Sequence, residues 1–242
     1  MTRAYLAFTE KGLALAQKLA SALPGTVARC GHGGPGLADW TAEQFAHADA
    51  LIFVGAVGIA VRAIAPHCRS KAVDPAVVVL DECGHFAVPI LSGHLGGAND
   101  LARALAAACG AVPVITTATD ANGVFAVDAW ARHQNCAVLE PGRIKRVSSR
   151  LLAGGPVRYR SEFPVAGQAP AGVVPAGEAE RADFALTLFP ADDALHLIPK
   201  IGVLGIGCRR GPALHSWKRP LHSSARPTAL QQRASRRRPA ST

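Results

Sequence analysis

The chain has 242 residues, 49% of them hydrophobic, which is enough for one large domain or two modest ones and excludes a disordered chain. Its net charge of +9 does not indicate nucleic-acid binding, because seven Lys or Arg and no acid follow Gly211, and residues 1–211 carry only +2. The six cysteines include no CxxC pair, which predicts free thiols in a reducing cytoplasm. No apolar run approaches the ~18 residues of a transmembrane helix, and the N-terminal sequence does not match a secretory signal.

The apolar pattern predicts strands that alternate with helices over residues 1–139. Strands are expected at 3–9, 27–30, 50–54, 76–80, 86–91 and 112–116, and helices at 11–23, 41–47, 59–65, 99–109 and 127–134. The runs at 50–54 and 76–80 are wholly apolar, as in strands that are covered on both faces. We therefore expect an α/β domain with a parallel or mixed sheet and flanking helices.

A second, smaller α/β module is expected at 140–199. It would contain a basic amphipathic helix at 143–152, a Pro-, Gly- and Ala-rich stretch, and a strand at 184–188. A new apolar strand at Ile201–Gly207 leads into GIGCRRG, so residues 200–211 would begin a truncated C-terminal domain.

Residues 212–242 form a basic tail without acids or apolar periodicity. One hypothesis is that the reading frame shifts near Gly211 and that the tail is out of frame. The alternative is a genuine basic tail that touches phosphates. Translation of the gene in its other two frames past codon 211 distinguishes them.

Three glycine-containing or polar turns join a strand to a helix. They are GAVG at 55–58, SGHLGG at 92–97 and TTATDANG at 116–123. Ligands of α/β sheets sit beyond the carboxyl ends of strands, so we expect all three turns on one edge.

The GAVG turn does not match a nucleotide-binding motif. Gly55 and Gly58 have GxxG spacing, and the chain contains neither GxGxxG with a ribose-binding acid nor GxxxxGK[ST]. The alternative for this turn is close packing of helix on strand. Arg62 stands in an apolar segment and Arg103 follows the second turn, and both are candidates to pair with ligand carboxylates.

The stretch SGHLGGAND gathers several polar groups at one helix start. Unpaired N–H groups there form a ready anion site, and glycines let a ligand approach. His94 is expected to act in acid–base chemistry or carboxylate binding. Alternatively, Asp100 could be an acid of the first helical turn that interacts favourably with the helix dipole, and Asn99 or Ser92 could cap the helix. The candidate ligand-binding residues are Ser92, Gly93, Gly96, Gly97 and Asn99.

Two further polar turns are candidates. Asp81 and Glu82 follow a buried strand and are either alternative bases or a solvated turn. In the other turn, the hydroxyls of Thr116 and Thr117 and the carboxylate of Asp120 could serve a site. The alternative is that these groups only form hydrogen bonds within their own turn. No GxSxG, HExxH or Cys/His cluster occurs, so no metal site is expected.

Five segments together resemble one family, the cobalt-precorrin-5A hydrolases (CbiG) of anaerobic cobalamin biosynthesis. They are GAVGIAVRAIAP, KAVDPAVVVLDECG, LSGHLGGANDLA, PVITTATDANGVFAVDAWA and VLGIGCRRG. The resemblance is dense from about Leu51 to Trp130 and resumes at Lys200–Gly211. Members of the family continue with a further α/β domain after the GIGCRRG turn.

The resemblance implies a hydrolase that opens the ring-A δ-lactone of cobalt-precorrin-5A and releases acetaldehyde, giving cobalt-precorrin-5B. The cobalt would be carried by the substrate, with no cofactor of the protein's own. Other cobalamin-pathway enzymes would be the partners, with no nucleic acid or membrane involved. The competing interpretation is a non-catalytic module that binds a tetrapyrrole or another anion.

Catalytic roles are assigned from the residues themselves. His94 is the preferred acid–base group, Asp81, Glu82 or Asp120 are alternative carboxylates, and Thr116, Thr117 and turn amides are donors to an oxyanion. The glycine-rich turns, Arg62 and Arg103 would bind the acetate and propionate groups of the macrocycle.

Overall fold

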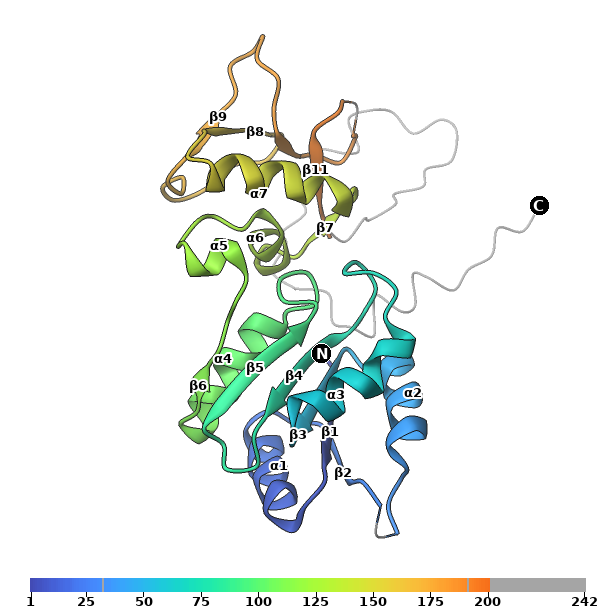
Figure 1. Ribbon diagram of the computed structural model, residues 1–242. Helices are drawn as coiled ribbons and strands as arrows, with labels where there is room; N and C mark the ends of the chain where they lie inside the picture. The colour runs from blue at the N-terminus through green and yellow to red at the C-terminus, as the bar shows by residue number, and fades with distance from the viewer. Residues whose placement is uncertain (32, 191, 201–242) are drawn as a thin grey trace, which may run out of the picture. The chain divides into compact units, whose positions relative to one another are not determined.

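The computed structural model describes residues 1–31, 33–190 and 192–200 (Figure 1). Met1–Pro199 pack as one compact unit that contains two β-sheets. The predicted strand at Ile201–Gly207, the remainder of the 200–211 piece and the tail at 212–242 lie outside the described residues.

The first sheet has six strands in the order β2-β1-β3-β4-β5-β6. Their bounds are β1 Arg3–Ala7, β2 Thr26–Arg29, β3 Ala50–Val54, β4 Ala76–Leu80, β5 Phe86–Leu91 and β6 Val112–Pro113. Neighbours among β1 to β4 are parallel, β5 is antiparallel to β4, and β6 is parallel to β5. The sheet is therefore mixed, which confirms the predicted fold class.

Helices cover both faces of this sheet. Helices α1 (Glu10–Ala22) and α4 (Ala98–Cys109) bury their apolar stripes on one face, whereas α2 (Leu37–His47) and α3 (Val57–Ile64) pack on the other. A short 3-10 turn, η1 (Ala65–His67), follows α3. Because both faces are covered, β3 and β4 are buried along their whole length, as their apolar sequences predict.

The reversal of β5 overturns the expectation that the three turns share an edge. Only residues 81–85 link β4 to β5, and a parallel connection needs a crossover of about a dozen residues, so the two strands form a hairpin. Strand β5 consequently ends at the opposite side of the sheet from β3 and β4. We call these sides the Asp81 edge, where β3 and β4 end, and the His94 edge, where β5 ends. The 55–58 turn lies at the Asp81 edge, and the 92–97 and 116–123 turns lie at the His94 edge.

The second sheet has five strands in the order β7-β11-β10-β8-β9. The strands are β7 Cys136–Val138, β8 Val157–Ser161, β9 Val173–Pro175, β10 Phe184–Leu186 and β11 Leu195–Pro199. Helices α6 (Val127–His133) and α7 (Ile144–Leu152) pack on it, and the short helices α5 (Ala118–Ala121) and η2 (Pro141–Arg143) complete the described elements. Strand β7 pairs with β11 of this sheet, although β7 lies before residue 140 in the chain. The predicted domain boundary between residues 139 and 140 stays a prediction.

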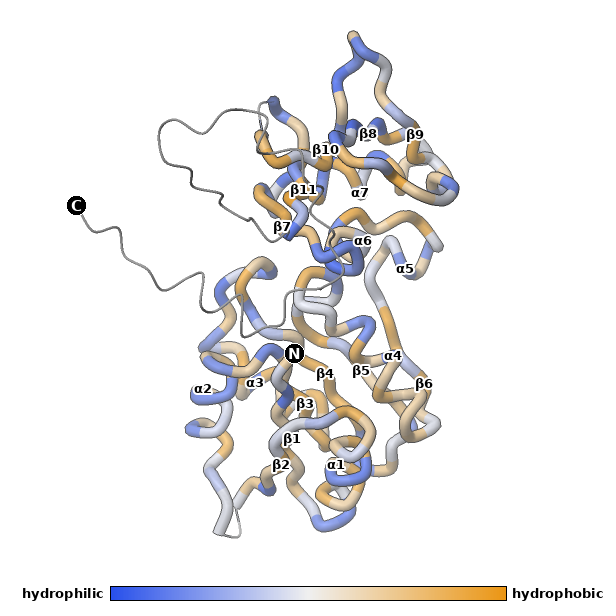
Figure 2. The backbone as a smooth tube through the Cα atoms, turned by 180° about the vertical axis from the view of Figure 1, so that it is seen from behind, coloured by the Kyte–Doolittle hydropathy of each residue, from blue (hydrophilic) through white to orange (hydrophobic). Residues whose placement is uncertain are grey.

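The hydropathy of the backbone follows the same architecture. In Figure 2 the tube is orange along the central strands β3 and β4, and bluer segments lie on exposed parts of the helices. In the part of the chain that the structure describes, no helix combines the length and apolar character that a membrane crossing requires.

Candidate functional site

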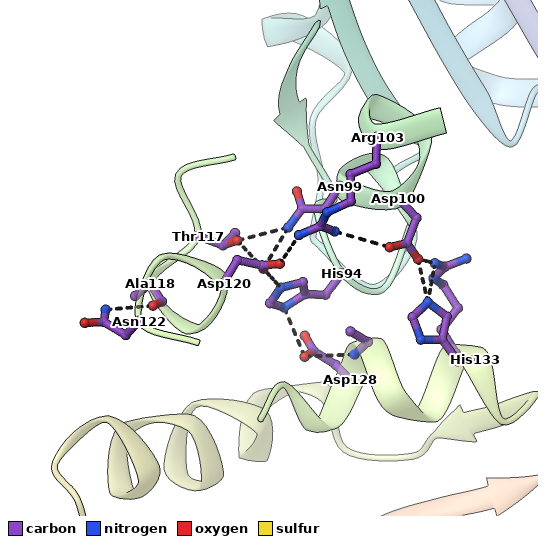
Figure 3. Close-up of polar contacts among 12 residues, drawn as sticks. His94, Asn99, Asp100, Arg103, Thr117, Ala118, Asp120, Asn122, Asp128 and His133 are labelled. Atoms are coloured by element: carbon purple, nitrogen blue, oxygen red, sulfur yellow. Dashed lines mark hydrogen bonds and ion pairs between the residues drawn. The ribbon is translucent and has the colours of Figure 1, made fainter. Parts of the chain in front are cut away.

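His94 lies in the turn between β5 and α4, and its ring contacts a carboxylate on each side (Figure 3). Nε2 lies 2.6 Å from Oδ2 of Asp120, and Nδ1 lies 3.1 Å from Oδ1 of Asp128. The side chains of Asp120 and Asp128 are 19% and 8% exposed, so Asp128 is the more deeply buried partner. A ring flanked by two carboxylates donates from both nitrogens, which favours the imidazolium form.

Asp120 collects hydrogen bonds from three other side chains. Its Oδ2 accepts from Thr117 Oγ1 at 2.6 Å and from Asn99 Nδ2 at 3.1 Å, and its Oδ1 accepts from Arg103 at 2.6 Å. Asn99 also donates to Thr117 Oγ1 at 2.9 Å. The structure thus brings together five of the predicted residues at the His94 edge.

These contacts shift the pKa values of both members of the pair. The hydrogen bond to Asp128 raises the pKa of His94 above its ordinary 6.5; burial opposes this rise and Asp120 adds to it. Burial alone would raise the pKa of Asp120, but hydrogen bonds from Thr117, His94 and Arg103 hold it well below its usual range. These shifts favour the imidazolium form of His94 and the carboxylate form of Asp120.

The SGHLGG turn is closed by its own hydrogen bonds. Ala98 N–H and Asn99 N–H, at the start of α4, donate to the carbonyls of Ser92 and Gly93 at 3.2 and 2.9 Å. The prediction of an open anion site is therefore wrong for these two amide groups, because carbonyls of the loop already accept their hydrogen bonds. Ser92 has a φ of 55° and donates its hydroxyl to the carbonyl of Asp74 at 2.9 Å, which is a structural contact.

The glycines of this turn are required by packing within the protein. A Cβ on Gly93 would lie 2.8 Å from Asn99 Oδ1, and one on Gly96 would lie 2.5 Å from the Cβ of Ser92. Gly97 has a φ of +86°, and its bare Cα leaves room for the guanidinium of Arg132. The space that each glycine leaves is filled by neighbouring residues.

A second ionic group adjoins the first on α4. Asp100 contacts Arg132 and lies 2.6 Å from His133 Nε2, both on α6. Arg103 joins the two groups, because it also lies 3.4 Å from Asp100 while it holds Asp120. Burial lowers the pKa of Arg132, and its Nε is buried without a hydrogen-bond partner in the described part of the chain.

Asp81 and Glu82 lie at the Asp81 edge, away from His94. The carboxylate of Asp81 accepts from the backbone N–H groups of Cys83, His85 and Phe86, and that of Glu82 accepts from Thr9 Oγ1 at 2.7 Å. The structure therefore does not bring these two acids together with His94, and their contacts fit a structured turn.

The predicted binding residues of the first turn are also elsewhere. Gly55 packs on the ring of Phe8, where a Cβ would lie 2.6 Å from a ring carbon, and Gly58 faces open space on α3. Arg62 is exposed at the Asp81 edge, so the structure does not bring it together with His94, and its pairing with a ligand carboxylate stays a prediction. Thr116 is exposed as well, and only its neighbour Thr117 contacts Asp120.

Asp128 was missed by the sequence reasoning. It lies in the first turn of α6 between Val127 and Ala129, and it is 5% exposed. A carboxylate in an apolar helical segment was a usable signal, because such a group is buried only when it has a partner. The same reasoning was applied to Arg62, where the side chain proves to be exposed.

The geometry suits proton transfer at His94 Nε2. Asp128 holds Nδ1 from the buried side and so orients the ring, while Nε2 faces the less buried Asp120. An oriented imidazolium can protonate a leaving oxygen or stabilise an oxyanion, and becomes a base once it has given up the proton.

Known proteins with similar sequences share this region. The family model described as Cobalamin synthesis G N-terminal matches residues 39–120. The cobalt-precorrin-5A hydrolase of Salmonella typhimurium is 37% identical over 86% of this chain and 66% of its own length. The enzyme of the same name from Priestia megaterium is 49% identical over 34% of this chain and 22% of its own length.

A solved structure shows the same fold. A cobalamin biosynthesis protein G homolog from Sulfolobus solfataricus superposes with a TM-score of 0.52 and 21% identity, covering 82% of this chain and 60% of that one. The chain thus spans about two thirds of the length of its Salmonella relative and somewhat less of this structure.

Proposed function

The chain belongs to the cobalt-precorrin-5A hydrolase family, and from this premise we propose that it hydrolyses the ring-A lactone of cobalt-precorrin-5A. The products would be cobalt-precorrin-5B and acetaldehyde. The substrate carries its own cobalt, so the proposal includes no cofactor of the protein. It also places the protein in the cytoplasm, where other enzymes of the pathway supply the substrate and take up the product.

The observation that carries the proposal is the ring of His94 between Asp120 and Asp128. Lactone opening needs a proton for the departing oxygen, and the imidazolium supplies one from Nε2. Asp128 acts as the positioning residue because it fixes the tautomer and orientation of the ring. Asp120 is the more exposed carboxylate and is the partner that the substrate displaces from Nε2.

The proposed reaction returns the proton to His94. Water adds to the lactone carbonyl and releases a proton to the solvent. The ester C–O bond breaks to leave the ring-A carboxylate, and Nε2–H protonates the departing oxygen to give a hydroxyl on the extruded carbon. Neutral His94 then takes the proton of this hydroxyl while the C–C bond to the macrocycle breaks. The electron pair of that bond passes to the macrocycle, and the extruded carbon leaves as acetaldehyde.

Arg103 is the residue best placed to bind a carboxylate of the macrocycle. Its side chain is 47% exposed, and it already contacts the carboxylates of Asp100 and Asp120. A substrate acetate or propionate can replace either one as a bidentate partner of the guanidinium. This exchange would free Asp120 from part of its network as the substrate binds.

The test is release of acetaldehyde from cobalt-precorrin-5A under anaerobic conditions. We expect turnover by the natural chain and a loss of about 100-fold or more for His94→Gln, as for removal of a general acid–base group. His47→Gln is the matched control, because His47 is exposed at the end of α2, and it should retain full turnover.

Two outcomes would contradict the proposal. Binding of the macrocycle without acetaldehyde would favour the non-catalytic tetrapyrrole-binding module. Equal turnover by His94→Gln and the natural chain would remove His94 from the mechanism.

A further inference from the structure

We propose that the β4–β5 hairpin is a binding site for a divalent transition-metal ion, with Asp81, Cys83 and His85 as its ligands. A carboxylate oxygen of Asp81, Sγ of Cys83 and one ring nitrogen of His85 all lie within 4.8 Å of one another. The site is at the Asp81 edge and is independent of the proposed hydrolysis at the His94 edge.

The spacing of the three ligands explains their convergence. They occupy positions 81, 83 and 85 of the short link between β4 and β5, which brings their ligand atoms together, whereas Glu82 bonds to Thr9. Metal–ligand bonds of about 2.0–2.3 Å place ligand atoms roughly 3.3–3.8 Å apart around a tetrahedral ion. Closing from 4.8 Å to this separation needs about an ångström of movement by side chains on an exposed turn.

The backbone of the turn is fixed without a metal. Asp81 Oδ1 accepts from His85 N–H and Phe86 N–H, each at 2.8 Å, and Oδ2 accepts from Cys83 N–H at 3.1 Å. Gly84 supplies the left-handed residue, with a φ of +71°. Oδ2 also lies 3.5 Å from His85 Nδ1, so the carboxylate already faces the ring nitrogen that would share the ion.

The ligand types select the class of ion. One sulfur, one nitrogen and one oxygen suit Zn²⁺ or Co²⁺, whereas Mg²⁺ and Ca²⁺ prefer sets made of oxygen alone. Three protein ligands leave a fourth position to water. With two of the three residues exposed, we expect affinity in the micromolar range rather than that of a closed four-ligand site.

Lys11 shows that this position attracts a cation. Its Nζ lies 2.8 Å from Cys83 Sγ, and the carboxylates of Asp81 and Glu82 belong to the same turn. A metal ion on Sγ must displace this ammonium group. Lys11 is therefore a competitor of the metal, and its removal should not weaken binding.

The test is titration of the full chain with Co²⁺ under reducing conditions, followed by absorption spectroscopy. We expect one ion per chain and a thiolate-to-cobalt charge-transfer band, displaced by Zn²⁺. Cys83→Ser should abolish the band, and His85→Gln should weaken binding at least tenfold. Lys11→Gln should bind Co²⁺ as tightly or up to about tenfold more tightly, because a competing charge is gone.

Matched controls separate this site from other thiols and from the His94 edge. Cys68→Ser changes another exposed cysteine, and His94→Gln changes a histidine–carboxylate group at the His94 edge; both variants should keep the band. The proposal is overturned if no band forms, if the band survives in Cys83→Ser, or if Lys11→Gln binds more weakly. Thermal unfolding of each variant without metal shows that a lost band reflects a lost ligand and not a lost fold.

Discussion

At the scale of single residues, the environment of His94 fixes its protonation state. Both ring nitrogens face carboxylates, and Asp128 is the largest cause of the raised pKa. These contacts favour the imidazolium form, in which the ring begins the proposed reaction as an acid. Lactone opening requires a proton donor first and an acceptor later, which is the order that an imidazolium allows.

Replacement of Asp128 tests this electrostatic arrangement. In Asp128→Asn we expect the pKa of His94 to fall and the free energy of unfolding near pH 6 to drop by about 1–3 kcal/mol, because a buried charge pair is broken. The pKa is measured from the ring signals of His94 in an NMR titration, with exposed His47 as the internal control. An unchanged His94 titration would show that Asp128 does not set its charge.

The raised pKa also predicts the direction of a pH effect on stability. Because the folded-state pKa of His94 exceeds its unfolded value of 6.5, the stabilisation is fully present below 6.5 and is lost as pH rises through the folded value. Denaturant unfolding at a series of pH values should therefore show a stability difference between the natural chain and His94→Gln that shrinks with rising pH. A difference that grows with pH would contradict the assignment.

At the scale of elements, the start of α4 is held by the turn that precedes it. The turn carbonyls accept the first amides of the helix, and glycines allow the backbone to fold on itself. This arrangement places His94 and Asn99 beside Asp120 without any ligand. The glycine-rich sequence is thus explained by close packing within the turn.

Two alanine substitutions should have opposite effects on stability. In Gly96→Ala the new Cβ would lie 2.5 Å from the Cβ of Ser92, so we expect a loss of about 1–3 kcal/mol from overpacking. Gly58→Ala is the matched control, because nothing lies within 4 Å of its Cβ, and helix propensity predicts a gain of about 0.5–1 kcal/mol. Chemical denaturation measures both. If the two variants changed the free energy of unfolding equally, the turn would have room for a Cβ on Gly96.

The sequence predicts the elements of the first sheet well, since continuous apolar runs and helical periodicity are strong local signals. The predicted bounds of β3, β4 and β5 agree with the structure. Thr9 caps α1 and accepts a hydrogen bond from Gly12 N–H at 3.0 Å. Strands β7, β8, β9 and β11 were not predicted. β7 and β9 have only three residues, β8 carries two arginines, and β11 contains a histidine and a proline. The pairing of β7 with β11 also depends on partners distant in the chain.

The site was predicted in part for a related reason. His94, Asn99, Arg103, Thr117 and Asp120 stand in turns whose polar residues are visible in the sequence. The exclusion of Asp81 and Glu82 depends on the direction of β5, which is a property of the whole sheet. The short 81–85 link contained that information, because it is too short for a parallel crossover.

At the scale of the whole molecule, polar contacts connect α4 and its preceding turn to α6, which packs on the second sheet. His94 contacts Asp128, and Asp100 contacts Arg132 and His133. Leu95 adds an apolar contact, since it packs against the core of the second sheet. The proposed catalytic ring is therefore positioned by residues that belong to both halves of Met1–Pro199.

Asp100 is the acid that contacts both Arg132 and His133 of α6. In Asp100→Asn the guanidinium of Arg132 loses its carboxylate. The two side chains are 33% and 38% exposed, so solvent screens the pair and we expect a loss of about 1 kcal/mol in the free energy of unfolding. The exposed Glu178 provides the control, and Glu178→Gln should change stability by less than about 0.5 kcal/mol. Similar denaturation midpoints for both variants would contradict this role.

The ionic network of the His94 edge has one more consequence, which concerns ionic strength. The carboxylates of Asp100, Asp120 and Asp128 face two guanidinium groups and two imidazole rings, so the network carries little excess charge. The guanidinium groups belong to Arg103 and Arg132, and the rings to His94 and His133. A charge-balanced surface does not attract a polyanion over long distances. We therefore expect the KM for the corrinoid to rise only slightly between low and high salt, whereas a steep rise would reveal an unbalanced basic surface. On the proposed function, selectivity at this edge depends on whether the carboxylates of a ligand can replace Asp100 and Asp120 as partners of the cationic side chains. The total charge of the ligand then matters little.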